Sequence, residues 1–194
     1  MTIFQAQQDM RAAYYAGATG AVASATAWLS AALASTFVGP WPAILTLLFA
    51  GMLIFPVSVL LSKLLGRSGR HAKDNPFAPL AIYGTIWMLL CIPIALAASR
   101  YRLEWFFPAM LLVIAGRYLT FQTLYGTRIY LFFGASLALA SAVLVGLQAS
   151  VQVAAYTGAL IEYIFGAAIF WTHRDRIPNA EGSALQQPTP GGLK

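Results

Sequence analysis

The stretch FFPAMLLVIAGRYLTFQTLY, residues 106–125, decides the fold class of this chain, because it is apolar almost throughout. About 20 consecutive apolar residues allow an α-helix to cross the hydrocarbon core of a bilayer. A second stretch, VQVAAYTGALIEYIFGAAIFWT at residues 151–172, has a similar length and character. Each stretch contains a single charged residue, Arg117 in the first and Glu162 in the second. The pattern predicts membrane-spanning helices, two of which carry a charge near their middle.

The composition of the whole chain fits the same class. Of its 194 residues, 59% are hydrophobic and 9% are charged, whereas about a quarter of the residues in soluble domains are charged. Only helices and closed barrels satisfy the backbone inside a membrane, and the period-two alternation of barrel strands is missing. The sequence therefore predicts an all-α integral membrane protein, a compact bundle of six transmembrane helices. We expect the spans near residues 14–38, 43–65, 79–98, 105–124, 129–148 and 151–172.

The distribution of basic residues predicts the orientation of the bundle. Nine lysines and arginines fall in the N-terminal segment, the second and fourth loops and the C-terminal segment, and only Arg100 and Arg102 fall in loops on the opposite side. The positive-inside rule places the basic side in the cytoplasm, so we expect an N-in, C-in topology. The chain then divides into a cytoplasmic N-terminal segment 1–13, a transmembrane domain 14–172 and a disordered cytoplasmic tail 173–194. In the alternative, residues 32–34 (Ala-Leu-Ala) mark signal-peptide cleavage, which would leave five spans.

The two intramembrane charges are the candidate functional site. Arg117 and Glu162 lie at similar distances from the ends of two spans that run in the same direction, so both are expected near the bilayer midplane. A charge there costs about 2.5–3.5 kcal/mol on insertion scales, and such groups normally pair or line a polar cavity. We expect Arg117 and Glu162 to contact each other directly or through water. Tyr118, Gln122 and Tyr163 are expected to extend this polar site.

Small residues predict how two of the spans pack. The sixth and fifth spans each carry a ridge of small residues at helical spacing: Ala155, Gly158, Ala159 and Gly166, and Gly134, Ala138, Ala142 and Gly146. Small residues let helix backbones approach closely, so we expect the two ridges to pack against each other. In the alternative, the ridge from Gly134 to Gly146 is the interface of a homodimer.

The loop GRSGRHAKDNP, residues 66–76, is the candidate site for anionic groups. Its glycines, serine and cations are residues that can hold a phosphate, although the spacing of a P-loop is absent. The side chains expected to make such contacts are Arg67, Arg70, His71 and Lys73. We favour contact with anionic membrane lipids over a dedicated phosphate site, because juxtamembrane cations both orient a protein and attract such lipids.

Several chemistries are excluded by what the spans lack. The two histidines, His71 and His173, both lie outside the predicted spans, which excludes an intramembrane bis-histidine haem. The sequence contains no His-Glu-x-x-His or Gly-x-Ser-x-Gly motif, and its single cysteine, Cys91, excludes an intrachain disulfide. We therefore predict no catalytic residue, metal or cofactor. The net charge of +6 sits in short loops between spans and does not indicate nucleic acid.

Three segments resemble a known family. They are Asp9-Met10-Arg11 with Tyr14-Tyr15, the loop 66–76, and EWFFPAM at residues 104–110 leading into GRYLTF at residues 116–121. They resemble a family of small uncharacterised bacterial membrane proteins, a domain of unknown function, and the resemblance extends to about residue 172. It implies a location in the bacterial envelope and carries no activity or binding residues with it.

The sequence leaves more than one function open. The first hypothesis is a small transporter or channel-like protein of the bacterial inner membrane. Many transporters consist of two inverted repeats, which here would be two three-span halves, but the sequences of the halves show no convincing match. In it Glu162 takes up a proton or cation. Arg117 either holds an anionic group of an unidentified small solute, ion or lipid, or tunes the protonation of Glu162. The second is a non-transporting scaffold or accessory subunit in which contact between Arg117 and Glu162 fixes the register of the helix bundle. We call this role a structural lock. An intramembrane enzyme acting on lipid is a third, less favoured alternative. The expected partners are membrane lipids and a second copy of the chain.

Overall fold

The computed structural model describes residues 1–173, which form seven α-helices and two short 3-10 helices. In chain order they are α1 (Ile3–Tyr14), η1 (Tyr15–Gly17), α2 (Ala18–Phe37), α3 (Pro40–Leu64), α4 (Ala78–Tyr101), η2 (Leu103–Trp105), α5 (Phe106–Tyr125), α6 (Ile129–Gly146) and α7 (Val151–His173). No strand occurs within residues 1–173. Apart from His173 at the end of α7, the predicted tail 173–194 lies outside the described residues.

Six helical segments are long and apolar enough to cross a membrane, as the hydrophobic pattern predicts. The first of them, Ile3–Phe37, includes both α1 and α2. The chain bends between these two helices, because Tyr15, Ala16 and Gly17 have positive φ angles of 49°, 52° and 89°. Residues 1–13, the predicted N-terminal segment, therefore lie mostly in a helix of their own.

Two helix boundaries that the sequence predicted only approximately are set by a proline and by a residue with a positive φ angle. α3 begins at Pro40, three residues before the predicted start, because the first turn of a helix tolerates the missing N–H of proline. The connection between α6 and α7 is broken at Gln148, whose φ is 50°. Ser150 then accepts a hydrogen bond from the backbone N–H of Val153 at 3.4 Å, as a helix N-cap does.

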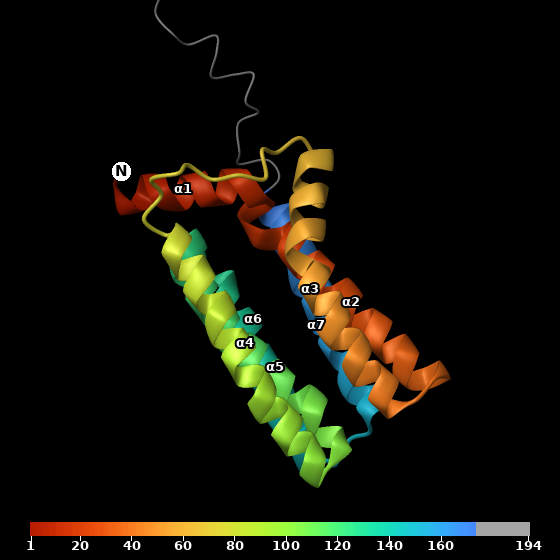
Figure 1. The fold of residues 1–194 in the computed structure, drawn as a ribbon. Coiled ribbons are helices and arrows are strands. Elements are labelled where there is room, and N and C mark those ends of the chain that lie inside the picture. Colours follow the sequence, from red (N-terminus) through yellow and green to blue (C-terminus); the bar gives the residue numbers. More distant parts are fainter. Residues whose placement is uncertain (174–194) are drawn as a thin grey trace, which may run out of the picture.

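Helices α2 to α7 form two groups of three rather than a single uniform bundle. α2 packs against α3 and α7, and α5 packs against α4 and α6. Contacts of α7 with α5 and α6 join the two groups, while α3 and α4 belong to different groups although they follow each other in sequence (Figure 1). The groups therefore do not correspond to the first three and the last three spans, which were the halves expected of an inverted repeat.

The predicted pairing of the two small-residue ridges is wrong, because each ridge faces a different neighbour. A Cβ atom on Gly158 of α7 would overlap the indole ring of Trp28 on α2. A Cβ atom on Gly134 of α6 would lie 2.9 Å from the carbonyl oxygen of Ala115 on α5. The physical reason is that Trp28, which is completely buried, needs a gap on the facing helix, and Gly158 supplies it.

α1 lies across one end of both helix groups (Figure 1). Thr2 and Gln5 form a capping box that begins the helix. The face of α1 that carries Ala6, Met10 and Ala13 is buried. Ile3 and Phe4, at its beginning, are exposed.

Candidate functional site

Glu162 lies at the junction of the two helix groups. It is near the middle of α7 and is 0% exposed. The polar side chains beside its carboxyl group are Ser24 of α2 and Tyr118 of α5. Neither carboxyl oxygen meets the geometry of a hydrogen bond with any group in residues 1–173. The structure therefore holds a carboxyl group in a closed site, where the Ser24 and Tyr118 side chains interact with it at close range but without well-aligned hydrogen bonds.

Arg117 is half-buried between α5 and α4, on a different side of α5 from Tyr118. Its Nη2 donates to Thr85 Oγ1 at 3.2 Å, and its Nη1 donates to Met88 Sδ at 3.3 Å. The guanidinium carbon lies 5.4 Å from the centroid of the Phe121 ring, a cation–π distance. Neutral groups of α4 and α5 thus surround this charge.

Arg117 and Glu162 do not form an ion pair. The one salt bridge within residues 1–173 joins Arg102 and Glu104 at 3.9 Å, outside the candidate site. Successive residues of an α-helix point about 100° apart, so Tyr118 faces Glu162 while Arg117 faces α4. The direct contact expected from the sequence is therefore absent, although the charge of Arg117 still reaches the carboxyl group through space.

A stack of aromatic rings closes the site on the side of α6. The Tyr118 and Phe133 rings stack with centroids 3.8 Å apart, and the Phe133 and Phe165 rings stack at 4.6 Å. Phe165 lies one turn after Glu162 on α7. Tyr118 and Phe133 are both buried, so these rings keep the surroundings of the carboxyl group apolar.

Of the other residues expected in this polar network, Tyr163 has its hydrogen-bonding partner elsewhere. The Tyr163 hydroxyl is 3.0 Å from Thr26 Oγ1, on an exposed part of the contact between α7 and α2. Gln122 is half-buried on α5. The sequence alone does not point to Ser24, Thr85 or Met88, because nothing in their spacing distinguishes them from the other small or apolar residues of their helices.

The loop 66–76 is hydrogen-bonded to α1 through the carboxylate of Asp9. Asp9 Oδ2 accepts hydrogen bonds from the backbone N–H of Ala72 at 2.9 Å and from Asn75 Nδ2 at 2.7 Å. His71 Nδ1 lies 3.0 Å from the hydroxyl of Tyr14. The backbone N–H of Ala72, in the loop proposed to hold an external phosphate, is therefore already bonded to an anionic group of the protein itself.

The three cations and one histidine of the predicted anion site divide into those that contact the protein and those that are exposed. The Arg67 guanidinium lies 4.7 Å from the centroid of the Tyr15 ring, and His71 contacts α1. Arg70 and Lys73 are exposed, as cations that meet anionic lipids would be.

α1 also holds the end of α5. Gln7 Nε2 donates to the Thr123 carbonyl oxygen at 2.8 Å, and Arg11 Nη1 donates to the Tyr125 carbonyl oxygen at 2.5 Å. The last carbonyl groups of a helix lack partners within the helix, so these side chains satisfy them. α1 therefore connects the α3–α4 loop to the α5–α6 turn.

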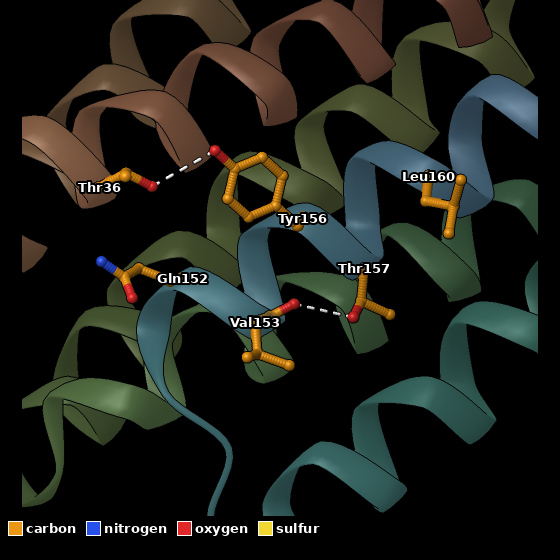
Figure 2. Close-up of a pocket in the computed structure, with 6 residues that line it drawn as sticks. All are labelled: Thr36, Gln152, Val153, Tyr156, Thr157 and Leu160. Carbon is orange, nitrogen blue, oxygen red and sulfur yellow. Dashed lines mark hydrogen bonds between the residues drawn. The ribbon is translucent and has the colours of Figure 1, made fainter.

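Two surface depressions lie at the opposite end of the molecule from α1. The larger, about 510 Å³, is shown in Figure 2 and is lined by Thr36, Gln152, Val153, Tyr156, Thr157 and Leu160. The smaller, about 280 Å³, also includes Gln152 and reaches Glu104. Neither depression is lined by Arg117 or Glu162.

The length and composition of the six helices indicate a multi-pass α-helical membrane protein. More specifically, the chain belongs to a family of unknown function, DUF7010, which it matches over residues 3–172. The match includes α1 and nearly all of α7, and it confirms the predicted resemblance to an uncharacterised family. No curated protein and no solved structure matches the chain.

Proposed function

We propose that this protein is a small transporter of the bacterial inner membrane, N-in and C-in, in which Glu162 takes up and releases a proton. The observation that carries the proposal is the complete burial of the Glu162 carboxyl group, with no ion pair and no well-aligned hydrogen bond in the described part of the chain. An ionised carboxylate is strongly disfavoured in such surroundings, so the closed conformation is suited to the protonated form. Intramembrane ionisable groups of this kind commonly belong to proton or ion pathways.

The separation of the two charges argues against the structural lock. A lock requires Arg117 and Glu162 to stabilise each other by contact, yet Arg117 bonds to Thr85 and Met88 instead. An uncompensated buried carboxyl group destabilises the fold. A functional role therefore explains the buried Glu162 carboxyl group better than a contribution to stability does.

The position of Glu162 supports coupling to a movement of the helix groups. Its carboxyl group lies between α2 of one group and α5 of the other. A shift of α7 against α5 would separate Glu162 from Tyr118 and admit water. The carboxyl group would then lose its proton, and the Arg117 charge on α5 would favour the ionised form.

The scaffold remains the second candidate, because neither surface depression reaches Arg117 or Glu162. A scaffold would keep Glu162 sealed from both sides of the membrane at all times. A transporter would expose it to each side in turn. The two functions therefore differ in whether the protonation of Glu162 responds to the pH on either side.

Labelling with dicyclohexylcarbodiimide tests this difference without knowledge of the substrate, because this apolar reagent modifies protonated carboxyl groups within membranes. The full-length protein in proteoliposomes is labelled at varied external pH with fixed internal pH, and then the reverse. The adduct on Glu162 is measured by mass spectrometry. We expect labelling to fall as the pH rises on either side.

Two variants make the labelling specific. Glu162→Gln should abolish the adduct, whereas Glu104→Gln, which alters a carboxylate that is 42% exposed, should leave it unchanged. Labelling of Glu162 that is independent of pH on both sides would refute transport and favour the scaffold.

A further inference from the structure

The two surface depressions adjoin each other at Gln152. They share Gln152, and they lie side by side where the end of α2 meets the beginning of α7. In the larger one, Gln152, Tyr156 and Leu160 follow each other at steps of four residues along one face of α7 (Figure 2). The larger depression therefore extends along the helix, away from the water-facing end and toward the middle of the span.

The larger depression offers few free hydrogen-bond donors. Thr36 Oγ1 donates to the Ala32 carbonyl oxygen at 3.0 Å, so the Tyr156 hydroxyl is the donor in their 3.3 Å contact. Thr157 Oγ1 likewise donates to the Val153 carbonyl oxygen at 2.8 Å. With these hydroxyl protons bonded within the protein, the remaining surface suits a hydrocarbon chain.

The smaller depression is rich in acceptors. It contains the carboxylate of Glu104 and the hydroxyl oxygen of Ser150. Gln152 Nε2 donates to the Ser35 carbonyl oxygen at 3.3 Å, which leaves the Gln152 side-chain oxygen as a further acceptor. A ligand group with several N–H donors and a positive charge would match these oxygens.

A positively charged side chain, Arg102, lies beside these acceptors. Arg102 Nε lies 3.9 Å from Glu104 Oε2, and both side chains are 42% exposed. A zwitterionic lipid carries a negative phosphate next to a positive ammonium group. Arg102 would face the phosphate and Glu104 would face the ammonium group. Trp105 follows Glu104 and is 37% exposed, and indole rings favour the headgroup layer of a bilayer.

We propose that the two depressions together bind one phospholipid with a primary ammonium head group. The ammonium N–H groups donate to Glu104, Ser150 and Gln152, the phosphate lies at Arg102, and an acyl chain lies in the larger depression along Tyr156 and Leu160. A choline head group carries the same charge without N–H donors, and a glycerol head group has no positive charge. This site is independent of the proton site proposed above.

Native mass spectrometry of the full-length protein tests the proposal. The detergent-purified protein is titrated with phosphatidylethanolamine, phosphatidylcholine or phosphatidylglycerol with identical acyl chains. We expect one phosphatidylethanolamine to bind about tenfold more tightly than either other lipid, the factor that a charge-assisted hydrogen bond supplies. Glu104→Gln should remove this preference, and Gln152→Leu should weaken it.

Matched controls lie at the other end of the molecule. Asp74→Asn removes an exposed carboxylate and Gln8→Ala an exposed amide, and both should leave lipid binding unchanged. Equal binding of the three lipids would overturn the proposal, because it would indicate ordinary contact with surrounding lipid only. A preference for phosphatidylglycerol, or an undiminished preference in Glu104→Gln, would overturn it as well.

Discussion

Replacement of Glu162 by methionine should stabilise the protein. Methionine has a similar volume and fills irregular apolar sites. The substitution removes two buried oxygen atoms that have no hydrogen-bond partner in the described residues. A buried polar group without such a partner costs about 1–3 kcal/mol in mutational data, so the free energy of unfolding should rise by about that amount. For a chain of this size the gain corresponds to a rise in Tm of roughly 2–12 °C.

The assay is thermal unfolding of the detergent-purified protein, followed by circular dichroism at fixed pH and detergent concentration. Glu104→Gln, at an exposed site, is the control and should change Tm by little. A fall in the Tm of Glu162→Met would refute the reasoning. It would show that the carboxyl group makes stabilising contacts, and the structural lock would then be the better explanation.

The packing of the helices supports three further predictions. Arg117→Met and Glu162→Met should show only weak coupling in a double-mutant cycle, because the two side chains do not touch; a coupling of about 3–5 kcal/mol, the loss expected when one partner of a buried ion pair is removed, would indicate a direct pair. Gly158→Ala should lower the free energy of unfolding by about 1–3 kcal/mol, because its Cβ would overlap an indole ring. Gly146→Ala, with no atom within 4 Å of its Cβ, should be nearly neutral, and equal melting temperatures of the two variants would contradict the close packing of Gly158 against Trp28. Asp9→Asn should speed hydrogen exchange and proteolysis of the 66–76 loop, because it weakens two hydrogen bonds to that loop; unchanged protection would show that other contacts hold the loop.

The apolar pattern predicted the helices well, because burial in hydrocarbon acts on each span separately. Residues 106–125 and 151–172 are α5 and, to within one residue, α7. Spacing along a helix also indicated a ridge of small residues on the sixth span, and Ala155, Gly158, Ala159 and Gly166 are all buried. Both inferences need only the properties of a single helix.

Inferences that depend on how helices are rotated against each other were less successful. Arg117 and Glu162 were placed at similar depth, but depth does not fix which side of α5 a residue occupies, and Tyr118 rather than Arg117 faces α7. Similarly, the partner of Gly158 depends on the position of Trp28, a large residue in a distant part of the sequence. The orientation in the membrane, the substrate and the second copy stay predictions.

The arrangement of α1 and α2 has a consequence for the order in which the chain is completed during synthesis. The partners of Gln7 and Arg11 lie 116 and 114 residues later in the sequence. The hydroxyl that meets Thr26 of α2 lies 137 residues later. The helices that are synthesised first, α1 and α2, therefore have partners that are synthesised much later. In particular, α2 lacks its α7 contacts until α7 has been made. Because such long-range contacts form late, a chain that stops before α7 should leave the alanine-rich face of α2 unpaired and open to quality-control proteases.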